Sequence, residues 1–139
     1  MTAVSATYEE KAVAAVLMGE AWSEGTRGMA AVAEVINERS VEKGRPPLQI
    51  ISDRRGKYHV FSCLNGTSIS RMIHRYQDVP DYQTALQLAE LACQAPVLLP
   101  GLSQGANHFT RASEKPYWAR GHIPVAVIGE HAFYRIENN

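Results

Sequence analysis

The sequence predicts an α+β domain that is mainly helical, with a small antiparallel β region late in the chain. Over the first two thirds, apolar residues recur at helical spacing between breaks rich in glycine and proline. From residue 107 onward, short apolar runs of strand length flank a turn at Gly129-Glu130. The chain has 139 residues, 45% of them hydrophobic and 20% charged. We therefore expect one domain, residues 1–139, built around one core.

The first helix is expected over residues 8–22. Thr7 and Glu10 form the capping-box pattern with which helices begin, and the stretch from Gly25 to Gly28 ends the helix. Similar signals predict helices over residues 27–42 and 82–93, and Asp81 is expected to cap the second of these. A short helix is expected to begin at Thr67 or Ser68. Strands are expected over residues 107–110, 125–128 and 132–136. Residues 48–52 fit a short helix or a strand equally, and residues 53–57 fit a polar loop.

The apolar stripe of the first helix is the most informative feature, because it ends in an acid. Val13, Val16 and Leu17 recur at i, i+3 and i+4, which marks the buried face of an amphipathic helix, and the next position on that face is Glu20. A carboxyl group there loses water, and desolvation favours the protonated form that general-acid catalysis requires. We therefore hypothesise that Glu20 is a catalytic acid and base. The alternative is a half-exposed glutamate with its carboxylate in water.

Three other acids in these helices have less specific patterns. Glu24 lies one turn beyond Glu20 and is a candidate second carboxylate if the first helix continues through Ser23. Otherwise it is solvated or caps the next helix. Glu34 and Glu38 lie four residues apart in the second helix, which is typical of a solvated helix face.

Charge and hydropathy narrow the expected partners. The formal net charge is zero and no basic run is present, so nucleic acid is not an expected partner. No segment is long and apolar enough to span a membrane. The first residues lack the basic start and apolar core of a signal peptide. We therefore expect synthesis in the cytoplasm and action after release, with a monomer as the default state.

Cofactor and metal motifs are missing from the sequence. It contains no phosphate-binding loop, no dinucleotide glycine fingerprint, no HExxH and no CxxC pair, so neither a cofactor nor a metal is expected. The five histidines match no metal spacing, although a zinc site built from the late ones stays open. Cys63 and Cys93 are compatible with one disulfide, but Cys93 lies on an apolar helical stripe and fits a free, buried thiol better.

Aromatic side chains gather late in the chain and offer walls for a groove. They are Phe109, Tyr117, Trp118, Phe133 and Tyr134, with Trp22 as an earlier member. Aromatic rings suit stacking on sugar rings, and the alternative is that they complete a modest core. Trp118 follows Pro116-Tyr117 in a loop context and is therefore favoured for a surface role.

Four blocks of sequence, in this order, carry a resemblance to a known family. They are Gly19-Glu20-Ala21 with Glu24-Gly25 and the run from Ala30 to Arg39, then Phe61-Ser62-Cys63, then Asn107-His108-Phe109-Thr110, and finally Trp118-Ala119 with the run from Ile128 to Arg135. In these blocks the chain resembles the SleB/CwlJ-type cell-wall hydrolases, known from spore cortex-lytic enzymes and from bacteriophages. The blocks extend over about residues 13–135. Glu38, Thr110 and Arg111 depart from the family pattern.

The resemblance implies a lysozyme-like α+β fold and cleavage of the glycan strands of peptidoglycan. It places the family's catalytic glutamate at Glu20, the residue that periodicity had also marked. It further implies substrate-binding or supporting positions near the groove for His108, Thr110, Trp118, His131 and Tyr134. A phage lysin or a spore-associated enzyme is the expected setting.

The number of acids favours one reaction. Glycoside hydrolysis usually uses two carboxyl groups, whereas a lytic transglycosylase manages with one. Glu20 would protonate the oxygen of the MurNAc-β-1,4-GlcNAc bond and then take the proton of the muramic 6-hydroxyl, which leaves a 1,6-anhydro end. The alternatives are a muramidase with Glu24 as second carboxylate, a zinc amidase that cuts the peptide stem, and a non-catalytic peptidoglycan-binding domain.

Overall fold

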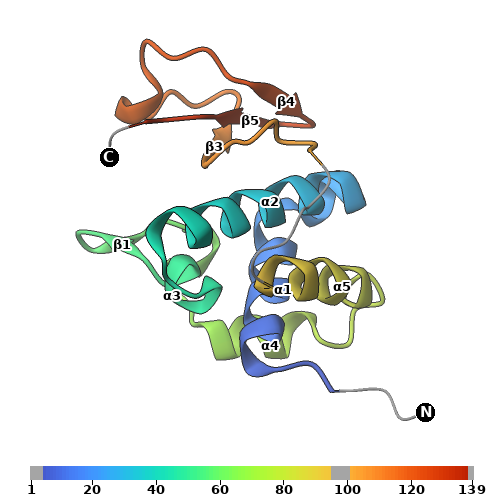
Figure 1. Ribbon diagram of the computed structural model, residues 1–139. Coiled ribbons are helices and arrows are strands. Elements are labelled where there is room, and N and C mark those ends of the chain that lie inside the picture. Colours follow the sequence, from blue (N-terminus) through green and yellow to red (C-terminus); the bar gives the residue numbers. More distant parts are fainter. Residues whose placement is uncertain (1–4, 95–100, 138–139) are drawn as a thin grey trace.

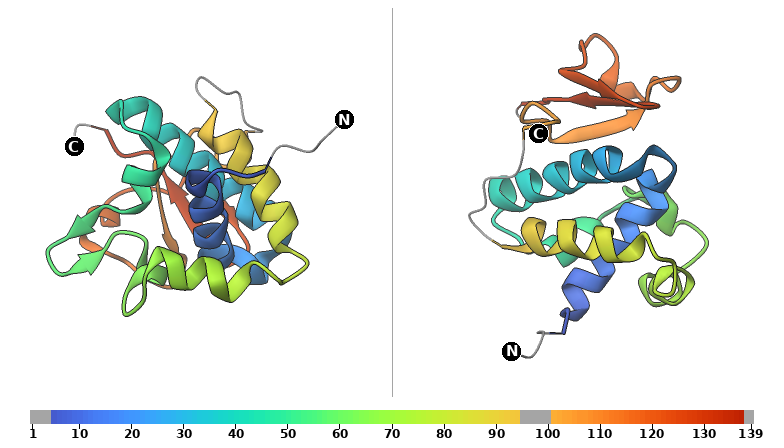
Figure 2. Two further views of the ribbon diagram at one scale, coloured as in Figure 1. Left: turned by 90° about the horizontal axis from the view of Figure 1, so that it is seen from below. Right: turned by 90° about the vertical axis from the view of Figure 1, so that its right-hand side faces the viewer.

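The computed structural model describes residues 5–94 and 101–137 and arranges them in two layers (Figure 1). The helices form one layer, and a three-stranded sheet from the last third of the chain lies over α2 (Figure 2). In chain order the elements are α1 (Tyr8–Ala21), η1 (Trp22–Glu24), α2 (Gly25–Lys43), α3 (Pro47–Ile51), β1 (Arg54–Arg55), β2 (Tyr58–His59), η2 (Ser62–Leu64), α4 (Ile69–Tyr76), α5 (Tyr82–Cys93), β3 (His108–Arg111), η3 (Tyr117–Ala119), β4 (Ala126–Ile128) and β5 (His131–Tyr134). The predicted mainly helical α+β class is confirmed.

Helix α1 is the centre of the helical layer. Its start is as predicted, since Thr7 Oγ1 accepts a hydrogen bond from Glu10 N and the Glu10 carboxylate accepts one from Thr7 N. Every residue from Ala12 to Met18 is at most 2% exposed. The helix is therefore buried on all sides, and the predicted single buried face is wrong. The reason is that α2, α3, α4 and α5 all pack around it.

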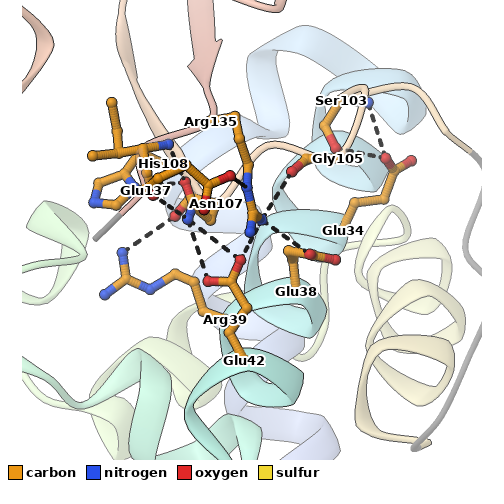
Figure 3. A network of polar contacts seen from close by, with 11 residues as sticks. Glu34, Glu38, Arg39, Glu42, Ser103, Gly105, Asn107, His108, Arg135 and Glu137 are labelled. Carbon is orange, nitrogen blue, oxygen red and sulfur yellow. Dashed lines mark hydrogen bonds and ion pairs between the residues drawn. The ribbon is translucent and has the colours of Figure 1, made fainter. Parts of the chain in front are cut away.

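Helix α2 separates α1 from the sheet. One of its acids, Glu34, does not have the solvent-exposed position that the sequence predicts. Glu34 is 8% exposed and does not belong to a solvated face. Its carboxylate accepts hydrogen bonds from Ser103 N at 2.9 Å and Ser103 Oγ at 2.7 Å (Figure 3), and a third from Leu102 N at 3.1 Å. The side chain thus anchors the segment that leads into the sheet. Glu38 is half-buried and pairs with Arg135 at 3.0 Å.

The shorter elements of the helical half agree with the sequence predictions in part. Residues 47–51 are helical, and the expected polar loop at 53–57 contributes a strand to a small hairpin, β1–β2. Ser68 caps α4 through Arg71 N. Helix α5 has the predicted bounds, but the Asp81 side chain does not cap it. Its carboxylate instead accepts a hydrogen bond from the Trp22 indole at 2.7 Å.

The sheet has the order β3-β5-β4, with all pairs antiparallel. Strand β5 is central and buried at all four residues. Phe133 belongs to the main core shared with the helices, whereas Ala132 and Tyr134 belong to a small outer cluster with Ala119. Alternate residues of β5 therefore face the helices and the outer loop.

Both cysteines are free thiols, as expected for Cys93. Burial raises the pKa of Cys93 to about 12. Among the residues that the structure describes, none of the helices has the length and hydropathy to cross a membrane.

Candidate active site

A cavity of about 490 Å³ opens where the end of α1 meets the β1–β2 hairpin, η2 and the edge strand β3. Five of the predicted site residues line it, and they come from both layers of the fold. They are Glu20, His108, Thr110, Trp118 and His131. The cavity is therefore the place where the chemistry predicted from separate sequence blocks converges.

Glu20 enters the cavity from the last turn of α1. Its Oε2 accepts a hydrogen bond from the backbone N–H of Cys63 at 3.0 Å. The preceding Gly19 makes this approach possible, since a Cβ there would lie 2.5 Å from Met72 Cε and 2.8 Å from Cys63 Cβ. The Cys63 thiol also lies against this carboxylate, and burial followed by the charge of Glu20 raises the pKa of the thiol. One oxygen of Glu20 is thus held in place by η2, at a half-buried position.

Glu24 does not lie in the cavity lining. Helix α1 ends at Ala21 and a 3₁₀ turn follows, so the assumed continuation of the helix through Ser23 is wrong. The Glu24 side chain is 7% exposed and accepts hydrogen bonds from Glu130 N at 2.5 Å and from His131 Nδ1 at 2.6 Å. A Cβ at Gly129 would lie 2.8 Å from its carboxylate carbon. Glu24 therefore joins η1 to the β4–β5 turn.

His131 links Glu24 to the cavity. Because a carboxylate accepts only, the Nδ1 of His131 carries the proton in this pair, and Nε2 is the nitrogen left for other partners. The ring also packs edge-on against Phe109, with centroids 5.5 Å apart. The orientation of His131 in the lining is thus fixed from two sides.

His108 occupies the β3 wall of the cavity. Its Nδ1 lies 2.9 Å from Asn107 Oδ1 (Figure 3). Its ring centroid lies 4.9 Å from that of Trp118. Burial, followed by the positive charges of Arg39 and Arg55, lowers the pKa of His108 to about 4. The imidazole is therefore neutral near pH 7 and offers the cavity a polar, uncharged ring.

The aromatic residues divide between the cavity and other places. Trp118 is in the lining and packs edge-on against Tyr134, at 5.5 Å between centroids. Tyr134 is 1% exposed and lies behind Trp118, so it supports the wall and does not line it. Trp22, a predicted groove wall, lies elsewhere and packs against Tyr76.

Comparison with known proteins identifies the family. A family model described as cell wall hydrolase matches residues 23–134, which is most of the chain. The chain belongs to the cell wall hydrolase family. The predicted resemblance is thereby confirmed, and the protein is an enzyme that degrades peptidoglycan. The match begins after Glu20 and so does not bear on that residue. No curated protein sequence matches the chain.

The fold of this cell wall hydrolase is similar to a solved structure. That structure is the catalytic domain of the germination-specific lytic transglycosylase SleB from Bacillus anthracis, with a TM-score of 0.53 and 18% sequence identity. The alignment covers 97% of this chain and 100% of the other. At this identity the likeness concerns the fold, and it confirms the predicted lysozyme-like architecture.

Two arginines of the cell wall hydrolase line the cavity and were missed in the sequence analysis. They are Arg39 of α2, which is 8% exposed, and Arg55 of the β1–β2 hairpin, which is exposed. A signal for Arg39 was present, because it continues the buried stripe of Val32 and Ile36 as Glu20 continues that of α1. Arg55 carried no such signal, since residues 53–57 were predicted to form a polar loop. Across residues 5–94 and 101–137, no three His, Cys, Asp or Glu side chains are grouped to hold a metal ion.

Proposed function

We propose that this enzyme is a lytic transglycosylase that cleaves the MurNAc-β-1,4-GlcNAc bond with Glu20 acting first as acid and then as base. The observation that supports the proposal most strongly is the contrast between two carboxylates. Glu20 lines the cavity, whereas Glu24 has both oxygens engaged by the β4–β5 turn. A reaction that needs one carboxyl group fits this arrangement better than one that needs the pair.

In the first step, Glu20 donates its proton to the glycosidic oxygen as the bond from C1 to that oxygen breaks. The leaving N-acetylglucosamine departs with a free 4-hydroxyl, and positive charge develops at C1 and the ring oxygen of the muramoyl sugar. The hydrogen bond from Cys63 N to Oε2 fixes the carboxyl group and leaves Oε1 to face the sugar.

In the second step, the 6-hydroxyl of the same muramoyl sugar attacks C1, and Glu20, now a carboxylate, takes the hydroxyl proton. The new C1–O6 bond closes a 1,6-anhydro ring, and Glu20 regains its starting state. No water is consumed. The neutral ring of His108 and the indole of Trp118 lie on the cavity wall, where we assign them to sugar contact. The likeness to the Bacillus anthracis lytic transglycosylase supports the same reaction.

The test is mass spectrometry of the soluble fragments released from purified peptidoglycan by the wild type, Glu20→Gln and Glu24→Gln. We expect fragments lighter by one water than hydrolytic products from the wild type and from Glu24→Gln, and none from Glu20→Gln. Activity of Glu20→Gln close to that of the wild type would contradict the role of Glu20.

Hydrolysis is the second candidate, because one other carboxylate lines the cavity. Glu114 follows β3 and is exposed at the rim. Fragments with free reducing ends, lost in Glu114→Gln as well as in Glu20→Gln, would establish a muramidase with Glu114 as the second carboxylate.

A further inference from the structure

The cavity lining contains a buried cation with incomplete charge compensation. Arg39 is 8% exposed and lines the cavity. Its Nε has no hydrogen-bond partner among the described residues, and its Nη1 reaches only the carbonyl oxygen of Asn107, at 3.4 Å (Figure 3). A buried guanidinium without a close carboxylate is costly, because desolvation is not repaid. Because Arg39 lies in the cavity lining, an anionic group of a bound ligand is a suitable partner for its guanidinium.

The nearest acid cannot serve as that partner. Asp53 Oδ2 lies 4.0 Å from Arg39 Nη2. Both Asp53 oxygens already accept hydrogen bonds from Arg45, each at 2.8 Å, in a bidentate pair. The hydrogen bonds from Arg45 are the first cause of the lowered pKa of Asp53, so this carboxylate is paired mainly with Arg45. The charge of Arg39 is thus balanced only at a distance.

Arg55 adds a second cation to the same wall. It comes from β1, and its guanidinium lies over the ring of Tyr117 at 5.6 Å, which restrains it without neutralising it. Within residues 5–94 and 101–137, no carboxylate forms an ion pair with Arg55, and Glu114 at the rim forms none with either arginine. Burial, followed by the positive charges of Arg39 and Arg55, lowers the pKa of His108, which also lines the cavity.

The chemistry of the substrate supplies one class of anion for this wall. On a peptidoglycan glycan strand, carboxylates belong to the lactyl group of the muramoyl sugar, which is either free or extended by a peptide stem with carboxylates of its own. Planar guanidinium groups bind carboxylates through paired, charge-assisted hydrogen bonds. We propose that Arg39 and Arg55 form a carboxylate-binding subsite that holds the lactyl or stem carboxylate of the muramoyl sugar while Glu20 acts at its C1. This inference rests on the proposed cleavage of the glycan strand and assigns its substrate specificity.

The test compares charged and neutral forms of the same substrate. Intact peptidoglycan and strands from which the stems have been removed are each used as prepared and after carbodiimide coupling of their carboxylates to methylamine. We expect the wild-type KM to rise about tenfold on the coupled forms, as loss of a charge-assisted hydrogen bond predicts. A larger rise for stem-free strands assigns the lactyl carboxylate, and a larger rise for intact peptidoglycan assigns the stem. Equal KM values on charged and coupled forms would overturn the subsite.

Variants locate the effect in the two arginines. We expect Arg55→Gln to raise KM about tenfold on charged strands, with little change in kcat and no change on coupled strands. Arg39→Lys keeps the charge and is expected to fall between the wild type and Arg39→Gln, whose thermal unfolding is measured in parallel because Arg39 is buried. The matched control is Arg120→Gln, an exposed arginine outside the cavity lining, which leaves all rates unchanged. An Arg55→Gln variant that loses the same activity on both forms would contradict the proposal.

These measurements separate the subsite from the reaction mechanism. Initial rates and KM are read irrespective of whether the fragments carry anhydro or reducing ends. Fragments with reducing ends would replace the transglycosylase mechanism and leave the charge comparison intact. Anhydro fragments released equally from charged and coupled strands would retain the mechanism and remove the subsite.

Discussion

The helical layer and the sheet layer of this cell wall hydrolase are held by different forces. The helical layer is organised around α1, whose residues from Ala12 to Met18 are buried in a core of aliphatic, methionine and aromatic side chains. The sheet layer also contributes Phe133 and Ile128 to that core. Its attachment to α2 and η1 also uses polar contacts, which are made by Glu24, Glu34 and Arg135.

The difference matters because the cavity lies between the two layers. Glu20 belongs to the helical layer and is positioned by close packing at Gly19 and one hydrogen bond from Cys63 N. His131 and His108 belong to the sheet and are positioned by hydrogen bonds with Glu24 and Asn107. Apolar packing tolerates little change in volume, and paired polar groups tolerate little loss of a partner. Substitutions in the two layers should therefore produce different kinds of damage.

The largest effect on stability is expected in the apolar layer. Leu17 is 0% exposed in the middle of α1. Leu17→Ala removes buried volume and leaves a cavity, and we expect it to lower the free energy of unfolding by about 3 kcal/mol, measured by urea denaturation. Leu91→Ala on α5 is the matched control, since Leu91 is 41% exposed and should cost far less. Equal losses for the two variants would contradict the central position of α1.

The next effect is expected where the sheet layer is anchored. Glu34→Ala leaves the N–H groups of Leu102 and Ser103 without their acceptor, and we expect a loss of about 2 kcal/mol in the free energy of unfolding. Hydrogen exchange at these two amides should accelerate more than exchange in α1. Glu90→Ala, at an exposed position on α5, serves as the control. Exchange that accelerates equally in both layers would show that the layers unfold as one unit.

A smaller effect on stability is expected at the contact between Glu24 and His131, where the rate of product release is also measured. Glu24→Gln keeps the volume of the side chain and removes the charge that holds His131 Nδ1, so we expect a loss of about 1.5 kcal/mol. The variant should still release the same products, more slowly, because it disturbs the position of His131 and not the acid. Complete loss of product, as in Glu20→Gln, would make Glu24 a participant in the reaction.

The features of the helical layer were more predictable from the sequence than the polar contacts that attach the sheet layer. The bounds of α1, α2 and α5 and the position of Glu20 rest on local periodicity and were predicted closely. Local patterns carry no information about partners that are distant in the chain, and Glu34 meets Ser103 across 69 residues while Glu24 meets His131 across 107. Glu34 was therefore misjudged as solvated, and the buried contacts of Glu24 with the β4–β5 turn were not predicted. Arg39 was missed although a charge on a buried stripe was the signal that had identified Glu20.

The smallest effect is the pH dependence that His108 adds to the sheet layer. The folded pKa of His108 is about 4, below the ordinary value of 6.5, so the unfolded state binds the proton more readily. Its stabilising contribution is complete above pH 6.5 and is lost as the pH falls toward 4. After discounting for solvent screening at this half-buried position, we expect His108→Gln to reduce the drop in unfolding free energy between pH 7 and pH 4.5 by about 1 kcal/mol.

The control for this prediction is His74→Gln, because His74 is exposed on α4 and belongs to the helical layer. Urea denaturation at both pH values should give the same pH dependence for His74→Gln as for the wild type. If His108→Gln also matches the wild type, burial and the charges of Arg39 and Arg55 lower the pKa of His108 less than expected. A flattened dependence in His108→Gln alone would place a proton-sensitive contact in the sheet layer at His108.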